Sequence, residues 1–227
     1  MRFDKVTKTN ERLEIKIVFS DSEYVDVMSI IESIRNLTNP FPDRGVNSVY
    51  YDTSYFKDAK ENLIGISSRR KRRLRFYNSP GDSKFYSASF EEKIKNNKLG
   101  HKLTYKSNKS DFFDTLDLSS PIVYDNNNLS DNLRPTSYVR YSRSYYSYFE
   151  TVRLTVDQDI AFASLINVDQ FSYNIRTNYF PRIIVEVKFD PCDYSIAKKI
   201  LNRFHRAPVR HSKYLSSLAE YGYFQYL

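Results

Sequence analysis

Charged and apolar side chains alternate along several segments of this chain, and this alternation limits its fold more than any other feature. Successive side chains of a strand point to opposite faces of a sheet, so a period of two indicates strands with one charged and one apolar face. Between Arg69 and Tyr77, Leu74 and Phe76 lie opposite a row of Arg and Lys. Alternation and β-branched or aromatic content predict strands at Arg12–Phe19, Ser48–Asp52, Arg69–Tyr77, Ser87–Lys95, Tyr138–Tyr146, Val152–Asp157 and Arg182–Phe189.

Helices are predicted between and after these strands. The residues from Ser20 to Glu23 have the form of a capping box, and apolar residues from Tyr24 to Ile34 then repeat with a helical period. Further helices are predicted after Asp193, at Ser212–Tyr221 and, as a short element, at Asp111–Leu116. No repeat or composition break divides the 227 residues, so we expect a single domain spanning residues 1–227.

The charged faces of the predicted strands are dominated by Arg and Lys, with a few carboxylates among them. For any one strand, the simplest interpretation is an antiparallel sheet with one face on a core and the other in solvent. A solvated face normally mixes many polar residue types, however, and the predicted helices need an apolar surface to cover. Closing the sheet would turn the charged faces inward. We therefore expect an α+β fold in which an antiparallel β-barrel tunnel with a charged lumen is flanked by helices.

The net charge of +8 indicates an anionic partner, which could be nucleic acid, a phosphate compound or an anionic membrane. Like charges in a partly desolvated lumen repel one another by several kcal/mol per close pair, and a bound polyanion would relieve that repulsion. Arg side chains also match phosphate oxygens bidentately. Two carboxylates on the charged faces, Glu14 and Glu186, could hold Mg²⁺ or Mn²⁺ beside such a ligand.

Other classes of site have little support in the composition. Only five glycines are present, which argues against a glycine-rich phosphate loop. Cys192 is the only cysteine, so neither an internal disulfide nor a cysteine-based zinc site is expected. The apolar runs are shorter than a membrane span and the first residues are polar, so we expect a cytoplasmic protein with no membrane segment in this chain.

Several short motifs follow one another over nearly the whole chain, and they include most of the charged strand faces. They read Arg12-x-Glu14-x-Lys16, Tyr50-x-Asp52-Thr53, Arg70-Lys71-x-Arg73-Leu74-Arg75-x-Tyr77, Glu91-x-Lys93-x-Lys95, Tyr141-x-Arg143, Arg153-Leu154-Thr155-Val156-Asp157, Glu186-Val187-Lys188 and Ser212-Lys213-Tyr214. In this order the motifs resemble the VTC domain, the polyphosphate polymerase domain of the vacuolar transporter chaperone proteins. That domain belongs to the triphosphate tunnel metalloenzyme, or CYTH-like, superfamily.

The resemblance implies an enzyme that transfers the γ-phosphate of ATP to a growing polyphosphate chain in a basic tunnel, with Mn²⁺ or Mg²⁺ as cofactor. Carried over by motif, the expected catalytic residues that contact the reacting phosphates are Arg73, Arg75, Lys93, Arg143, Arg153, Lys188 and Lys213. Additional phosphate-binding residues are expected at Arg12, Lys16, Lys71, Lys95 and Lys102. Glu186 is expected to be the main metal ligand, with Glu14 as the second.

Other functions remain open at this point. Arg12 stands where hydrolytic members of the superfamily usually have a glutamate, which favours the polymerase over a tripolyphosphatase or nucleoside triphosphatase. A non-catalytic polyphosphate-binding module has the same sequence pattern. Single-stranded nucleic-acid binding is a more distant alternative, because the basic residues alternate with apolar ones and carry carboxylates among them. We therefore expect ATP and polyphosphate as ligands, no nucleic acid, and a separate membrane partner if the product is translocated.

Overall fold

The structure is a computed structural model that describes residues 2–8, 12–79, 84–97, 99–107, 115–118, 123–124, 127–128, 133–172 and 174–225. Its strands are β1 (Arg2–Lys8), β2 (Leu13–Ser20), β3 (Leu37–Thr38), β4 (Arg44–Thr53), β5 (Ser68–Asn78), β6 (Tyr86–Asn96), β7 (Leu99–Ser107), β8 (Thr115–Asp117), β9 (Val123–Tyr124), β10 (Asn127–Asn128), β11 (Leu133–Tyr148), β12 (Val152–Ser164), β13 (Gln170–Ser172), β14 (Asn178–Tyr179) and β15 (Arg182–Phe189). Its α-helices are α1 (Tyr24–Glu32), α2 (Lys57–Ile64), α3 (Tyr194–Asn202) and α4 (Lys213–Glu220).

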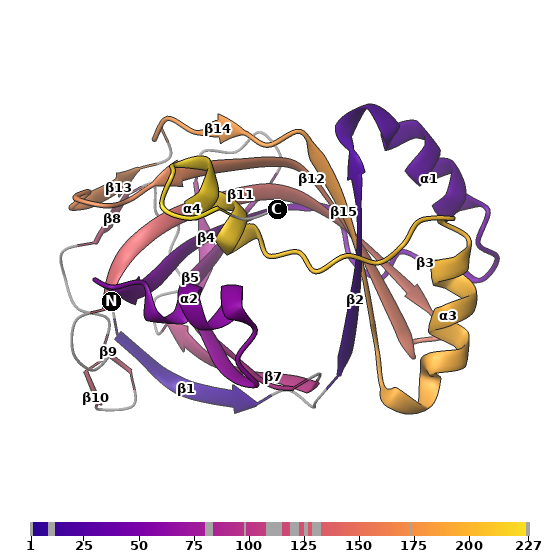
Figure 1. Ribbon diagram of the computed structural model, residues 1–227, viewed down its shortest axis with the longest axis horizontal. Helices are drawn as coiled ribbons and strands as arrows, with labels where there is room; N and C mark the ends of the chain where they lie inside the picture. The colour runs from indigo at the N-terminus through magenta and orange to yellow at the C-terminus, as the bar shows by residue number, and fades with distance from the viewer. Residues whose placement is uncertain are drawn as a thin grey trace.

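Most of these strands form one curved sheet, in which the described strands follow the order β10-β9-β1-β7-β6-β5-β4-β11-β12-β15-β2. The pairs are antiparallel except for β1 with β9. The sheet curls into a tunnel (Figure 1), and its two sides meet where Arg12, directly before β2, forms a bridge with Gly100 of β7. The predicted antiparallel tunnel with flanking helices is confirmed. Along the described residues, however, the seam between β2 and β7 is this bridge rather than a full ladder.

The outer face of the sheet has two apolar areas, and both are covered. Helices α1 and α3 pack on β2, β15 and β12 through a buried cluster that includes Ile31 and Ile200. The small β8–β13 sheet covers part of β4 to β7, where Phe76 and Phe171 pack together. The alternation seen in the sequence therefore has a direct cause, because one face of each strand is buried beneath these elements.

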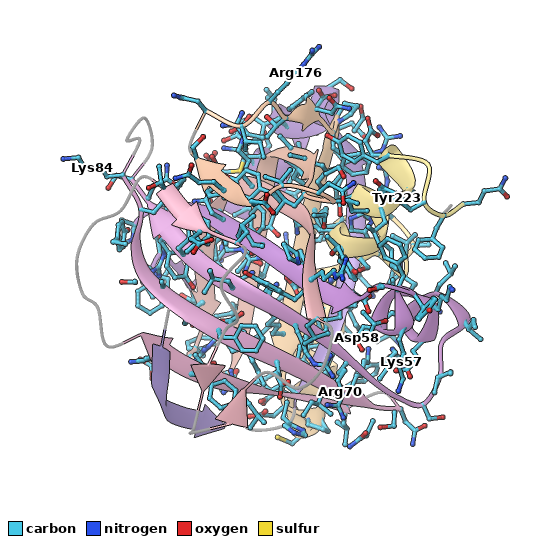
Figure 2. The ribbon with its side chains drawn as sticks, turned by 90° about the vertical axis from the view of Figure 1, so that its left-hand side faces the viewer. Lys57, Asp58, Arg70, Lys84, Arg176 and Tyr223 are labelled. Carbon is cyan, nitrogen blue, oxygen red and sulfur yellow. The ribbon has the colours of Figure 1, made fainter. Side chains whose placement is uncertain are left out.

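One predicted helix differs from the structure, and one observed helix is not among the predictions. The segment Thr115–Asp117 forms strand β8, so the helix predicted at Asp111–Leu116 is wrong at its C-terminal end, and residues 111–114 lie outside the described residues. Helix α2 was not predicted from the sequence. It packs against β4, β5 and α4, and its residue Ala59 is buried in the same cluster as Tyr214 of α4. Its residues Lys57 and Asp58 lie close to Arg70 of β5 (Figure 2).

The fourth helix lies against the inner face of the sheet and fills one part of the tunnel with apolar side chains. Tyr214, Leu215 and Leu218 of α4 pack against a buried cluster that includes Val139 of β11 and Ile184 of β15. The interior is thus apolar around α4, and its remaining part is polar.

Candidate functional site: a cationic tunnel

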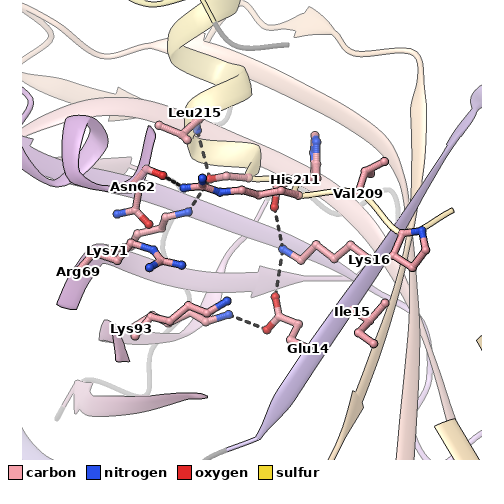
Figure 3. A pocket seen from close by; sticks show the side chains of 14 residues that line it. Glu14, Ile15, Lys16, Asn62, Arg69, Lys71, Lys93, Val209, His211 and Leu215 are labelled. Carbon is pink, nitrogen blue, oxygen red and sulfur yellow. Dashed lines mark hydrogen bonds and ion pairs between the residues drawn. The ribbon is translucent and has the colours of Figure 1, made fainter. Parts of the chain in front are cut away.

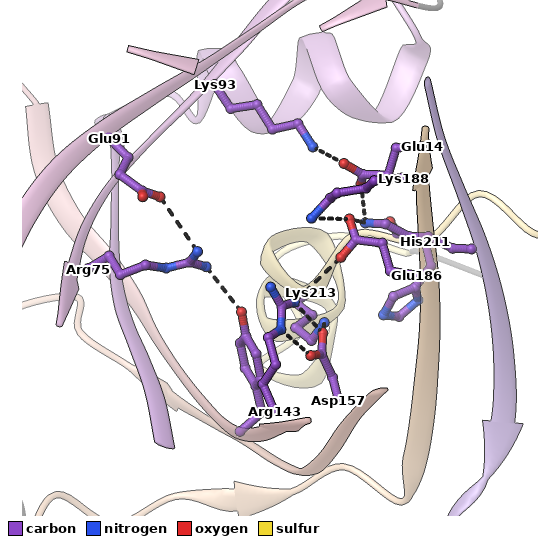
Figure 4. Close-up of polar contacts among 12 residues, drawn as sticks. Glu14, Arg75, Glu91, Lys93, Arg143, Asp157, Glu186, Lys188, His211 and Lys213 are labelled. Carbon is purple, nitrogen blue, oxygen red and sulfur yellow. Dashed lines mark hydrogen bonds and ion pairs between the residues drawn. The ribbon is translucent and has the colours of Figure 1, made fainter. Parts of the chain in front are cut away.

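The polar part of the tunnel is built from side chains that β2, β5, β6, β7, β11, β12, β15 and α4 direct inward, and Figure 4 shows many of them. Cross-strand neighbours share a face, so the ladder registers bring Lys93 beside Lys71 and Lys102, and Lys16 beside Glu186. The charged residues on this inner face include Glu14, Lys16, Lys71, Arg73, Arg75, Glu91, Lys93, Lys95, Lys102, Arg143, Asp157, Glu186, Lys188 and Lys213. Cations clearly outnumber carboxylates among them.

Glu91 holds one group of these cations. Its carboxylate accepts hydrogen bonds from Arg73 Nε at 2.8 Å and Lys102 Nζ at 2.6 Å, and Arg75 Nη1 lies 3.7 Å away. Arg75 also donates to the Tyr141 hydroxyl at 3.0 Å. Burial tends to raise the pKa of Glu91, but the charges of Arg75, Arg73 and Lys102 outweigh it and hold this pKa well below its usual range. Glu91 is therefore ionised at neutral pH.

A second group surrounds the two carboxylates that the sequence assigns to a metal. Lys93 Nζ donates to Glu14 at 2.6 Å, and Lys16 Nζ lies 3.1 Å from Glu14 and 3.9 Å from Glu186. Lys188 Nζ is 3.3 Å from Glu186. Burial opposes ionisation of Glu14, yet Lys93 and Lys16 lower its pKa well below the usual value. Glu14 and Glu186 thus lie close together, and the Lys16 ammonium group contacts both carboxylates.

Asp157 organises the third group. It is fully buried and pairs in a fork with Arg143, whose Nε and Nη2 donate to its two oxygens at 2.5 and 2.7 Å. Lys213, at the start of α4, pairs with the same carboxylate. Arg143 Nη2 also lies 3.4 Å from Glu186, which joins this group to the second one. Burial lowers the pKa of Lys213 to about 8, although Asp157 opposes the shift.

A cavity of about 340 Å³ opens into the tunnel beside these groups (Figure 3). It is lined by Glu14, Lys16, Arg69, Lys71, Lys93 and Lys95, together with Leu215 and the segment 208–212. Lys71 donates to the Ser212 hydroxyl at 2.6 Å, and no described carboxylate forms an ion pair with it. Burial, followed by the charges of Lys16 and Lys93, lowers the pKa of Lys71 well below its usual value. The cavity is therefore lined by more basic groups than carboxylates, and an anion bound there would stabilise the charged form of Lys71.

Hydrogen bonds from the tunnel wall also fix α4. Asp52 accepts hydrogen bonds from the Asp58 and Ala59 backbone N–H groups at the start of α2, and from the Tyr214 hydroxyl at 2.8 Å. The Tyr214 ring stacks on Tyr50, with 4.7 Å between centroids. The Tyr50 hydroxyl in turn accepts from Arg73 at 3.1 Å. A chain of contacts thus connects both helices to a guanidinium in the lumen.

The predicted site residues do not all lie in these groups. Ten of the predicted cations line the lumen as described above, whereas Arg12 and Arg153 are set apart. Arg12 lies at the seam of the tunnel, 36% exposed, with its Nε 3.5 Å from Asp190. Arg153 is exposed at the start of β12, opposite Lys188 in the ladder. Both residues lie at the edge of the site.

Several contributors were not among the predicted site residues. Glu91 and Asp157 were recognised as charged positions on strands, but which cations they hold depends on contacts between distant segments. Tyr50 and Tyr141 contribute hydroxyl groups, and aromatic residues in strands give no signal that separates this use from packing. Arg44 lies opposite Arg143 in the ladder of β4 with β11, and the predicted strand, which begins at Ser48, does not include it.

The two carboxylates of the second group fit a divalent cation only in combination with a ligand. Within the described ranges, no group of three or more His, Cys, Asp or Glu side chains is arranged to hold a metal ion. Glu14 and Glu186 provide adjacent carboxylate oxygens, and Mg²⁺ is commonly held by one or two carboxylates plus substrate phosphates. The donor set therefore fits a metal that arrives with, or is completed by, a phosphate ligand.

The family is settled by a match to the family model of the VTC domain, which covers residues 11–221. The chain belongs to the VTC domain family. Together with the cationic lumen, this membership supports an enzyme of the tunnel type that acts on polyphosphate or triphosphate. No described helix has the length and hydropathy needed to cross a membrane.

Comparisons with individual proteins add little to this assignment. No curated protein matches the chain. Among solved structures, a protein from Pyrococcus horikoshii OT3 is 12% identical with a TM-score of 0.49, and the match covers 92% of this chain and 96% of that one. A putative adenylate cyclase from Vibrio parahaemolyticus is 9% identical with a TM-score of 0.47, covering 92% and 98%. The Mimivirus capping enzyme triphosphatase is 12% identical with a TM-score of 0.39, covering 86% and 89%. None of these TM-scores reaches 0.5, so the assignment rests on the VTC match.

Proposed function

We propose that this chain is a metal-dependent polyphosphate polymerase, which transfers the γ-phosphate of ATP to the end of an inorganic polyphosphate chain. The observation that carries the proposal is the row of inward-facing cations, which runs from the Lys71 cavity to Arg75 and Arg143 and exceeds the carboxylates in number. A linear polyanion matches such a row, because each phosphate brings oxygens that Arg and Lys bind well.

The proposed reaction needs no protein nucleophile. A terminal oxygen of the polyphosphate chain attacks the γ-phosphorus, the bond from that phosphorus to the bridging oxygen breaks, and ADP leaves with the electron pair. Catalysis then depends on holding the reactants in line and on stabilising charge. In this role Arg73, Arg75 and Arg143 would bind the transferred phosphoryl group, and Lys93 and Lys188 would orient its neighbours. A Mg²⁺ or Mn²⁺ held by Glu186 and Glu14 would supply further charge neutralisation when bound.

The position of Arg12 favours transfer to phosphate over transfer to water. Glu14 and Glu186 are the two carboxylates at the expected metal site, and Arg12 lies away from them in an ion pair with Asp190. The tunnel therefore lacks a further carboxylate from this strand. A carboxylate there could serve as a base for a water molecule, whereas a phosphate acceptor is already ionised and requires none.

The proposal is tested by incubating the purified protein with ATP and Mn²⁺ or Mg²⁺ and resolving the phosphate products by chain length. We expect long chains and ADP. Orthophosphate as the sole phosphate product would instead indicate a hydrolase, and unchanged ATP with retained polyphosphate binding would indicate a binding module.

A pair of variants links the activity to the tunnel. Arg73→Ala combined with Arg75→Ala should abolish polyphosphate binding, because both guanidinium groups face the lumen. Arg70→Ala is the matched control, since Arg70 is an exposed residue on the outer face of the same strand. If the double variant, still folded, bound polyphosphate as tightly as the control, the assignment of the ligand to the tunnel would be wrong.

A further inference from the structure

Arg44, on β4, is an additional cation on the inner face of the sheet. It lies beside the C-terminal end of the neighbouring strand β5, whereas the cavity that Lys71 lines lies toward the N-terminal end of that strand. It is the first residue of β4 and lies opposite Arg143 in the ladder with β11. Its guanidinium carbon is 5.0 Å from the ring centroid of Tyr77 and 4.8 Å from that of Tyr145. Tyr77 has the same parity as Arg73 and Arg75, so these contacts place Arg44 on the lumen side.

The position of Arg44 extends the cationic row along the tunnel. On β5 the inner-face residues run from Lys71 at the cavity to Tyr77 beside Arg44, six residues apart, which is roughly 20 Å of strand. The guanidinium carbon of Arg44 is also 5.8 Å from the ring centroid of Phe41, which is 52% exposed. Three aromatic rings therefore lie around Arg44, and that of Phe41 is exposed to solvent.

Arg44 differs from most of the other lumen guanidinium groups because no described carboxylate forms an ion pair with it. Its sequence neighbour Asp43 accepts a hydrogen bond from the Ser144 hydroxyl instead. Arg44 Nε is buried and lacks a hydrogen-bond partner among the described residues. Burial raises the pKa of the neighbouring Tyr145, and the charges of Arg143 and Arg44 oppose that shift. Arg44 thus adds a charge to the lumen that the protein itself does not neutralise.

We propose that Arg44 binds a phosphate of a polyphosphate chain that extends past Arg75 and Arg143 toward Tyr77. This inference rests on the proposed function and adds to it a subsite that only a chain longer than a triphosphate reaches. The three rings hold the guanidinium by cation–π contacts and keep water from part of it, so its N–H groups are pre-positioned for phosphate oxygens. A nucleobase is a poorer match, because Arg44 already occupies the rings on which a base would stack.

The test compares the binding of tripolyphosphate and long-chain polyphosphate to Arg44→Gln. The glutamine removes the charge while keeping a polar side chain. We expect long-chain polyphosphate to bind about tenfold more weakly, the effect of losing one charge-assisted contact, and tripolyphosphate to bind with little change. The dependence of long-chain affinity on salt should also become less steep, by roughly 0.7 in the log–log slope. Arg44→Lys should keep that slope and lose part of the affinity, because lysine carries the charge without the guanidinium fork.

The matched control is Arg140→Gln, which removes an exposed arginine from the neighbouring strand β11 on the outer face. Normal tripolyphosphate affinity in Arg44→Gln also shows that the lumen is folded. The inference is overturned if long-chain affinity matches that of the control, or if both ligands weaken equally. If the wild-type protein binds neither ligand, the proposed function itself fails, which is a separate outcome.

Discussion

Replacing Glu91 with glutamine should lower the stability of the ligand-free protein and increase its affinity for phosphate chains. Glu91 is 2% exposed and is the shared partner of Arg73, Arg75 and Lys102. Glutamine preserves the shape of the side chain and removes its charge. The three cations then face one another without the carboxylate that separates them.

The expected loss of stability follows from the contact distances. At 2.6, 2.7 and 3.7 Å, the three contacts are each worth roughly 4–6 kcal/mol at an effective dielectric constant of about 20, before desolvation is subtracted. Breaking a buried ion pair by removing one partner has a net cost of about 3–5 kcal/mol. For a domain of this size that corresponds to a fall in Tm of roughly 6–20 °C.

Tripolyphosphate should reverse much of this loss. In the wild-type protein a phosphate has to compete with Glu91 for the three cations, and its own charge is repelled by the carboxylate. In Glu91→Gln neither obstacle exists, so we expect tripolyphosphate to bind at least about tenfold more tightly, which adds about 1.4 kcal/mol to the stabilisation at saturating ligand. Thermal unfolding with and without tripolyphosphate, together with calorimetric titration, measures both effects.

Glu92→Gln provides the control on the same strand. Glu92 is 6% exposed and pairs with Arg72 Nε at 3.2 Å on the outer face, away from the lumen. The Glu92→Gln protein should be less stable than wild type for the same physical reason, but its affinity for tripolyphosphate should stay at the wild-type value. If Glu91→Gln and Glu92→Gln responded alike to tripolyphosphate, or if Glu91→Gln bound it more weakly than wild type, the assignment of Glu91 as a competitor for the ligand would be refuted.

Two further predictions concern Lys213 and Glu186. The pKa of Lys213 lies near 8 in the folded protein and near 10 when unfolded, so in this window the unfolded chain binds more protons. The stability of the ligand-free protein should therefore rise with pH from about 8 to 10, while the affinity for tripolyphosphate falls over the same range. Lys213→Arg should remove this fall in affinity, and a pH titration in which the variant kept it would contradict the prediction. Glu186→Gln should abolish metal-dependent turnover, as measured by product analysis, but should retain most polyphosphate binding, as measured by a binding titration in the presence of EDTA. Full metal-dependent activity in this variant would rule out Glu186 as the metal ligand.

The faces of the strands could be predicted from the sequence because the side-chain period of a strand is a local property. Strand β15 has the predicted bounds Arg182–Phe189, and β5 extends the predicted segment by one residue at each end. The lumen positions of Arg73, Lys93 and Glu186 follow from parity alone once the covered face is known. This is the reason that the charged tunnel was predictable without any information on strand order.

The pairing of charges could not be predicted in the same way. Asp157 and Lys213 are 56 residues apart, and only the packing of α4 against the inner face of the sheet brings them together. Helix α2 has no long amphipathic pattern, and it begins where the Asp52 carboxylate, on the preceding strand, binds its first N–H groups. Arg44 shows a related limit, because a strand predicted from aromatic and β-branched residues starts later than the hydrogen-bonded ladder does.

The carboxylates of the lumen should give the tunnel a preference for phosphate chains over single phosphates. Every one of Glu14, Glu91, Asp157 and Glu186 is paired with at least two cations, so a phosphate that binds the cations of these groups has to replace existing ion pairs. Lys71 and Arg44, which have no such partner among the described residues, are the exceptions. A single orthophosphate can displace only one carboxylate, and its gain is offset by the ion pairs that it breaks. A chain whose phosphates are covalently linked meets several cation groups at once, and after the first contact each further one is intramolecular. We therefore expect the same ion pairs that stabilise the ligand-free lumen to select against single phosphates and in favour of a polyanion that spans the groups around Glu91, Glu14 and Asp157.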